Sequence, residues 1–233
     1  MIPLRDENPA GSVPAVTLVI IATNCAAFLY ELVLGPTLRP FMYEWGMVPL
    51  RLTLAVQEGN EPLSQAALPL ATSMFLHWSW LHLIGNMWYL WIFGDNVEDR
   101  MGHVRFLVFY LAAGLVAGLL HVFFNPASRV PTVGASGAIA GVLGAYLVAF
   151  PRARIITLVP LFPFFQVMAL PAVLMLGLWF VYQFFSGALS LAWSAAGGGG
   201  VAWWAHVGGF AFGAVVAGLL VRGARPRSRA RVE

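Results

Sequence analysis

The stretch GASGAIAG at residues 134–141 contains Ser136, a serine whose surroundings suit a nucleophile. The stretch opens an apolar segment that Pro151 ends, so Ser136 is expected in the first turn of a buried helix. Backbone N–H groups in a first helical turn lack intrahelical partners and can stabilise a developing negative charge. The small neighbours Ala135 and Gly137 leave the hydroxyl open to a substrate. A small-residue face for close helix packing has the same composition, so other polar residues must decide between the two interpretations.

Three other polar residues in apolar segments could complete a site for acyl transfer: His82, Asn86 and His206. A serine beside a histidine base is the minimum for covalent acyl transfer, and we expect His206 to be that base. His82 and Asn86 are four residues apart and therefore share one face of a helix. Their ring N–H and amide N–H groups could donate to an oxyanion, beside the backbone N–H of Ser136. Ionisable residues inside apolar segments are functional candidates, because their burial is unfavourable unless they are paired.

Glycines are expected to support this site by letting the helices that carry Ser136 and His206 pack closely. They are Gly134, Gly137, Gly141, Gly209 and Gly213. Within each helix the glycines recur four residues apart, and such small faces allow two helix backbones to approach. A close approach would bring the His206 ring within hydrogen-bond reach of the Ser136 hydroxyl.

An acidic third member of a catalytic triad is missing from the second half of the sequence. No aspartate or glutamate occurs between Asp99 and Glu233, so the segments that carry Ser136 and His206 offer no carboxylate. Asp95 lies nine residues beyond the candidate oxyanion asparagine, about 13 Å further along a helix. The sequence therefore predicts a Ser–His dyad, in which packing and a hydrogen bond to a neutral group orient the histidine.

The composition places these residues in a membrane protein. Of 233 residues, 60% are hydrophobic and 10% are charged, which is more apolar surface than a soluble domain of this size could bury. All thirteen basic residues are arginines, and their clusters fit membrane topology better than nucleic-acid binding. Cys25 stands alone in an apolar run, so the sequence contains neither a disulfide framework nor a cysteine metal site.

Six apolar segments predict an all-α polytopic membrane protein with a single six-helix domain at residues 14–222. The expected helices cover residues 13–34, 74–93, 106–124, 136–150, 164–185 and 201–221. Residues 1–13 are expected as a short polar tail, and residues 223–233 as an Arg-rich tail. Residues 35–73 are expected as a long interfacial loop, and residues 186–200 as a glycine-rich loop.

The arginines predict the orientation of the six helices. Three of the thirteen lie on one side of the membrane, namely Arg39, Arg51 and Arg129. The other ten lie on the side of both termini, which the positive-inside rule places in the cytoplasm. The helices that carry the four candidate site residues then all run inward from the outer surface. The four residues therefore fall in one layer, within about 10 Å of that surface.

The chain resembles the rhomboid family of intramembrane serine proteases, in its prokaryotic six-helix form. The resemblance covers about residues 14–222 and is carried by GASG at 134–137, HWSWLHLIGN at 77–86, EDRMG at 98–102, and AHVGG at 205–209 with Gly213. It implies that Ser136 is the nucleophile and that His206 is the general base and then the general acid. It also implies that His82 and Asn86 contribute to the oxyanion site. Some members carry a tyrosine four residues after the nucleophile, beneath the histidine ring, where this chain has Ala140.

The resemblance also implies a substrate class and a location. We expect cleavage of single-span membrane proteins near the outer end of their helix, after a small residue, in a prokaryotic inner membrane. Separately, aromatic residues of the helix at 164–185 could form a contact with the helix at 74–93 that opens for substrate, although an apolar lipid-facing stripe would have the same composition. These residues are Trp179, Phe180, Phe184 and Phe185. No cofactor, metal or nucleic acid is expected, and the oligomeric state stays open.

Two other functions stay open at this point. A non-proteolytic relative that binds membrane proteins for quality control is expected to lack the serine or the histidine, and both are present. A channel or transporter could use a membrane histidine and asparagine to line a polar path, but it would gain little from the GASG stretch. Metal binding by His77, His82 and His206 is not expected, because a helical wheel places His77 opposite Asn86.

Overall fold

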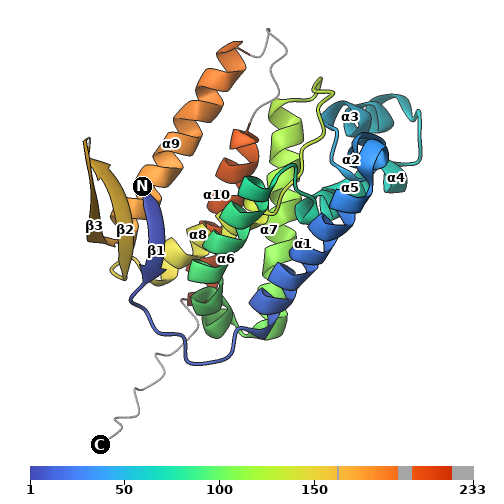
Figure 1. Cartoon of the computed structure of the whole chain (residues 1–233). Coiled ribbons are helices and arrows are strands. Elements are labelled where there is room, and N and C mark those ends of the chain that lie inside the picture. The colour runs from blue at the N-terminus through green and yellow to red at the C-terminus, as the bar shows by residue number, and fades with distance from the viewer. Residues whose placement is uncertain (162, 194–200, 222–233) are drawn as a thin grey trace, which may run out of the picture.

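Helices form most of this computed structural model, which describes residues 1–161, 163–193 and 201–221 (Figure 1). The apolar segments form α1 (Ala15–Val33), α6 (Trp80–Met101), α7 (His103–Phe124), α8 (Ser136–Ala149), α9 (Ala172–Trp193) and α10 (Trp203–Val221). By length and composition, three helices in the described part of the chain can cross a membrane: 15–33, 103–124 and 172–191. The Arg-rich tail predicted at 223–233 and residues 194–200 of the predicted glycine-rich loop lie outside the described residues. The loop prediction is wrong for residues 186–193, which continue α9.

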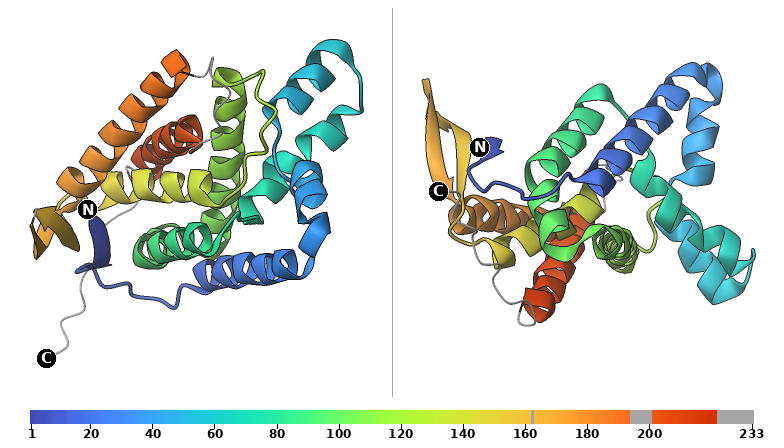
Figure 2. Two further views of the ribbon diagram at one scale, coloured as in Figure 1. Left: turned by 45° about the horizontal axis from the view of Figure 1, so that its top comes forward. Right: turned by 90° about the horizontal axis from the view of Figure 1, so that it is seen from below.

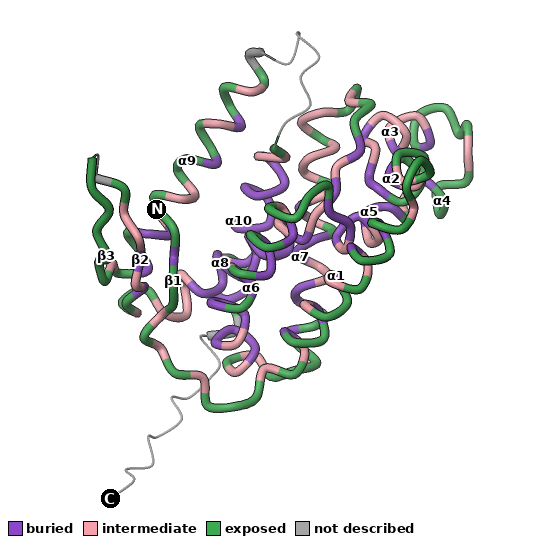
Figure 3. Tube along the Cα trace, viewed as in Figure 1, coloured by how far each residue is buried: buried purple, intermediate pink, exposed green. Residues whose placement is uncertain are grey.

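The short helix α8 is the element against which α6, α7, α9 and α10 pack, and most of its side chains are buried (Figures 2 and 3). Its glycine face meets the glycine face of α10. A Cβ atom at Gly209 would collide with the carbonyl oxygen of Gly137, and one at Gly213 would collide with that of Gly141. The two backbones are therefore in contact, and a side chain at these positions would force the helices apart.

The segment 35–73, expected as a loop, forms short helices instead. These are α2 (Leu38–Trp45), α3 (Pro49–Glu58), α4 (Leu63–Ala67) and α5 (Pro69–Thr72), with 3₁₀ turns at Gly35–Thr37 and Ser73–Phe75. Proline occupies the first position of α3 and of α5, where its missing N–H breaks no intrahelical bond. The apolar residues of this segment bury one another in a separate small cluster: Met47, Leu52, Ala55, Ala66 and Leu70. The prolines and glycines of the segment therefore mark boundaries between short helices.

The prediction of an all-α fold is wrong for three segments, which form an antiparallel sheet with the strand order β1-β2-β3. The strands are β1 (Ile2–Asp6), β2 (Arg154–Leu161) and β3 (Phe164–Pro171). β1 falls in the expected tail, and β3 replaces the start of the expected fifth helix, which begins only after Pro171. Isoleucine, valine, threonine and phenylalanine are frequent in β2 and β3, and these residues fit an extended chain better than a helix. Figure 2 shows the sheet at the edge of the bundle, beside the start of α9.

Polar contacts attach β1 to the helices. The Trp88 indole N–H donates to the Pro3 carbonyl oxygen over 2.7 Å. The Asp6 carboxylate accepts hydrogen bonds from the Tyr146 hydroxyl at 2.6 Å and from the Asn96 amide at 3.0 Å. Burial raises the pKa of Asp6 to about 6. These contacts hold the first residues of the chain against α6 and α8.

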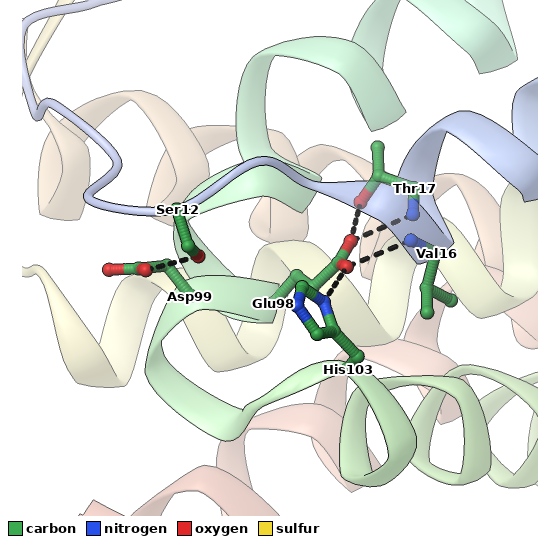
Figure 4. A network of polar contacts seen from close by, with 6 residues as sticks. All are labelled: Ser12, Val16, Thr17, Glu98, Asp99 and His103. Carbon is green, nitrogen blue, oxygen red and sulfur yellow. Dashed lines mark hydrogen bonds and ion pairs between the residues drawn. The ribbon is translucent and has the colours of Figure 1, made fainter.

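Glu98 joins the end of α6 to the start of α1 (Figure 4). Its buried carboxylate accepts hydrogen bonds from the backbone N–H groups of Val16 at 2.8 Å and Thr17 at 2.7 Å. The Thr17 hydroxyl donates to it at 2.7 Å, and His103 Nδ1 lies 2.6 Å away. Val16 and Thr17 belong to the first turn of α1, and the preceding Pro14 has no side-chain acceptor for their N–H groups. Glu98 therefore caps α1 from another helix.

Replacing Glu98 by alanine is expected to lower the free energy of unfolding by about 2–4 kcal/mol, because buried donors lose their acceptor. Glu98→Gln keeps the volume and one acceptor oxygen, so it should lose less. Asp99 is a matched control, because it accepts a hydrogen bond from the exposed Ser12 hydroxyl. Thermal unfolding in one detergent compares the variants, and an equal loss in Glu98→Ala and Asp99→Ala would contradict the capping role.

Candidate active site

A cavity of about 890 Å³ is lined by residues of α6, α8, α9 and α10 and by the segment before α8. Its wall contains Ser136, His206, His82 and Asn86. Ser136 is the first residue of α8, and His206 lies in the first turn of α10. Both helices therefore direct their N-terminal ends toward the cavity, and the partial positive charge of a helix N-terminus favours an anion.

The structure brings Ser136 and His206 into direct contact. The Nε2 atom of His206 lies 2.8 Å from the Ser136 hydroxyl oxygen. His206 is 8% exposed, so protein surrounds nearly all of its ring. The close approach of α8 and α10 through their glycines makes this contact possible, because both residues lie at the same ends of these two helices. The arrangement suits removal of the hydroxyl proton by the ring nitrogen.

The other ring nitrogen of His206 contacts a residue that the sequence analysis missed. His206 Nδ1 lies 2.8 Å from the side-chain oxygen Oε1 of Gln183, which comes from α9. A neutral amide, and not a carboxylate, therefore occupies the position beside Nδ1. The available signal was a buried amide inside an apolar segment, the same signal that drew attention to Asn86.

Aromatic rings from α9 and α10 lie beside His206, whereas the residue four positions after Ser136 is Ala140, which has no ring. The Trp179 ring centre lies 5.9 Å from that of His206, with an angle of 35° between the ring planes. The Trp203 ring meets it edge-on at 6.5 Å. A contact of the α9 aromatic residues with α6 was expected, but in the described residues the ring contacts of α9 with other helices are made with α10. Phe180 stacks on Phe210 at 4.7 Å, for example.

His77 lies beside Asn86, which corrects the expectation that it faces the opposite side. Its Nε2 atom is 3.0 Å from the Asn86 amide nitrogen, and its ring meets the His82 ring edge-on at 5.0 Å. The expectation was wrong because α6 begins only at Trp80, so a helical wheel does not apply to residue 77. The Ser79 hydroxyl oxygen caps α6 by accepting a hydrogen bond from the backbone N–H of His82.

Glu31 of α1 holds the chain at His77. Its carboxylate is buried and accepts a hydrogen bond from the His77 backbone N–H, with distances of 3.2 and 3.3 Å to its two oxygens. Glu31 therefore acts on the segment before α6, whereas the partner of His206 Nδ1 is Gln183.

Gly134 brings the chain before α8 against the two candidate oxyanion residues. Its φ angle is +124°, which residues other than glycine rarely adopt. A Cβ atom here would lie 2.6 Å from His82 Nε2 and 3.5 Å from the Asn86 amide nitrogen. Its backbone N–H donates to the Ser73 carbonyl oxygen at 2.8 Å. Only glycine therefore lets this turn lie directly against the His82 ring.

Comparison with known proteins gives a family match. A family model described as "Rhomboid domain" matches residues 64–223. Presenilin-associated rhomboid-like protein A, mitochondrial, from Danio rerio is 31% identical over 176 residues, which cover 72% of this chain and 42% of the relative. Rhomboid protein 1, mitochondrial, from Saccharomyces cerevisiae is 32% identical over 167 residues, covering 68% and 43%. Rhomboid protease GluP from Bacillus subtilis is 45% identical over 78 residues, covering 34% and 15%. The chain thus spans less than half the length of these relatives.

These relatives overturn the prediction of a prokaryotic inner membrane. The Danio and yeast proteins, which match over more than two thirds of this chain, are both named as mitochondrial. The bacterial protease matches over a much shorter segment. The location named for these two relatives is therefore mitochondrial and not a prokaryotic inner membrane. The error arose because the motifs that carry the resemblance identify a family and not the membrane in which a member resides.

Proposed function

The chain belongs to the rhomboid family, and from this premise we propose that it is a serine endopeptidase that cleaves membrane-spanning proteins within the bilayer. The observation that carries the proposal is the 2.8 Å contact between His206 Nε2 and the Ser136 hydroxyl oxygen in the wall of a cavity. The rhomboid protease from Bacillus subtilis supports it, because its name gives proteolysis as an activity of the family.

In the proposed reaction, His206 Nε2 takes the hydroxyl proton while Ser136 Oγ attacks the carbonyl carbon of the scissile peptide bond. The resulting oxyanion accepts hydrogen bonds from the Asn86 amide, the His82 ring N–H and the Ser136 backbone N–H. His206 then gives its proton to the leaving amine as the carbon–nitrogen bond breaks. The acyl group stays on Ser136 until a water molecule, deprotonated by His206, releases it.

The proposed dyad differs from a triad in the group that faces His206 Nδ1. The Gln183 oxygen can accept the ring N–H, but it carries no charge to balance the imidazolium that forms during the reaction. We therefore expect a lower turnover than that of serine proteases whose histidine faces a buried carboxylate.

We further propose that six helices cross the membrane, with both termini on the Arg-rich side. Ser136 then lies toward the opposite surface, so a substrate helix would be cut near its end on that side, after a small residue. The cavity has walls on α6 and on α9, with Tyr89 on one and Trp179 on the other. A substrate helix would enter between these two walls from the lipid.

The test uses purified protein in liposomes with a single-span substrate that carries a different tag at each end. Wild type is expected to release two fragments whose masses locate the cut inside the membrane segment, and Ser136→Ala is expected to release none. Binding of the substrate without cleavage by both proteins would favour the non-proteolytic function instead. Cleavage by both proteins would overturn the assignment of Ser136.

A further inference from the structure

Gln183 lies where it can decide which nitrogen of His206 carries the proton. We propose that Gln183 is a positioning residue that holds His206 in the tautomer required of a base. Because Gln183 belongs to α9, we also propose that this tautomer depends on the docking of α9 against α10. The inference rests on the proposed protease function and adds to it how His206 is held in the tautomer that can accept the Ser136 proton.

The two contacts of His206 define the tautomer. The Gln183 Oε1 atom is 2.8 Å from Nδ1, and the Ser136 hydroxyl oxygen is 2.8 Å from Nε2. A carbonyl oxygen can only accept a hydrogen bond, so the proton must be on Nδ1 for this contact to be favourable. Nε2 is then free to receive the serine proton. In the other tautomer Nε2 would donate to Ser136, and the ring could not act as its base.

Because Gln183 and His206 are buried, loss of their hydrogen bond would not be compensated by water. Gln183 is 5% exposed and His206 is 8% exposed, so water has little access to either group. A buried ring N–H that loses its acceptor has an unfavourable free energy, and the ring can avoid this by moving its proton to Nε2. Loss of the Gln183 oxygen would thus favour the unproductive tautomer.

One face of α9 holds it against α10. On that face, Phe180 stacks on Phe210 at 4.7 Å, and Trp179 lies 5.9 Å from Phe210. Gln183 is one helical turn beyond these two residues and therefore shares their face. The other face of α9 is largely exposed, as Figure 3 shows. Any outward movement of α9 would withdraw the Gln183 oxygen from His206 together with the aromatic rings.

The main test compares Gln183→Leu, Gln183→Glu and the control Val181→Ala, an exposed position on the same helix. Gln183→Leu is expected to lower kcat by at least about tenfold with little change in KM, because the Gln183 side chain is buried in the cavity wall with its oxygen against His206. The reaction rate of Ser136 with a small fluorophosphonate should fall by the same factor. Gln183→Glu keeps an acceptor oxygen and should retain far more activity than Gln183→Leu.

A second test concerns the docking of α9. Phe180→Ala weakens the contact with Phe210 without touching His206, so it should slow fluorophosphonate labelling in the wild-type background. In the Gln183→Leu background it should have little further effect, because the oxygen that docking delivers is already gone. Equal slowing in both backgrounds would overturn the coupling between docking and tautomer.

The outcomes separate this inference from the proposed function. Inactive Ser136→Ala together with full kcat and labelling rate in Gln183→Leu would overturn the positioning role alone. Equal impairment of Gln183→Leu and Gln183→Glu would also overturn it, because the acceptor would then be irrelevant. A rise in KM with an unchanged labelling rate would assign Gln183 to substrate access. Full cleavage by Ser136→Ala would overturn the protease function itself.

Discussion

Ser136→Ala and His206→Ala are each expected to reduce kcat for a membrane substrate by several orders of magnitude, because nucleophile and base work only together. In serine proteases, removal of either group lowers kcat by about 10⁶-fold, and removal of both is hardly worse. The kcat of the double variant should therefore be no lower than that of the less active single variant. The contact of 2.8 Å between the two side chains is the structural reason for this non-additivity.

The comparison needs a serine that lies outside the cavity, and the exposed Ser64 of α4 supplies one. Ser64→Ala should cleave like the wild type. All variants should show the same unfolding midpoint in detergent, which excludes a loss of fold as the cause. Losses in the two single variants that multiply in the double variant would show that Ser136 and His206 act independently.

The second large effect is expected at Asn86. Asn86→Ala should lower kcat by about 10²–10³-fold, equivalent to roughly 2.7–4 kcal/mol, because a donor to the oxyanion is lost. KM should change little, since the oxyanion forms only as the bond is attacked. The structural basis is that Asn86 and His82 both lie against Gly134, two residues before the proposed nucleophile.

Ile84 provides the control for Asn86, because it lies on the same helix with an exposed side chain. Ile84→Ala should leave kcat within about twofold of the wild type, as expected of an exposed position. A variant Asn86→Ala that raises KM and leaves kcat unchanged would assign Asn86 to substrate binding and would contradict the oxyanion role.

The four candidate site residues could be predicted from the sequence because each has a fixed place in a helix. Spacing puts His82 and Asn86 on one face, and the apolar segments set the depths of Ser136 and His206. The glycines indicate which helix backbones approach. The shared helix face, the depths and the glycine spacing all depend on local sequence. The structure places all four residues in the wall of one cavity.

His77 and Gln183 show where the sequence analysis fails. The position of His77 depends on the residue at which α6 begins, and the capping residue Ser79 sets that boundary. Gln183 faces His206 because of how α9 is rotated against α10, which depends on rings such as Phe180 and Phe210. Contacts of this kind follow from side-chain packing between distant segments, which a single sequence does not reveal.

The sheet could not be predicted from the sequence for a related reason. Residues 164–171 are as apolar as a membrane helix, and composition alone cannot distinguish a strand from a helix in such a run. Their pairing with β2 is local, whereas the pairing of β2 with β1 joins residues about 150 positions apart in sequence. Bonds such as that from Tyr146 to Asp6 then fix β1 in place.

The central claim is that Ser136 is a nucleophile activated by His206, and covalent labelling tests it most directly. Wild-type protein in detergent is treated with a fluorophosphonate, its intact mass is measured, and the modified residue is located by peptide mapping. We predict a single adduct on Ser136, much slower labelling of His206→Ala, and none of Ser136→Ala. Labelling of Ser136→Ala at the wild-type rate, or an adduct on another residue of the wild type, would contradict the claim.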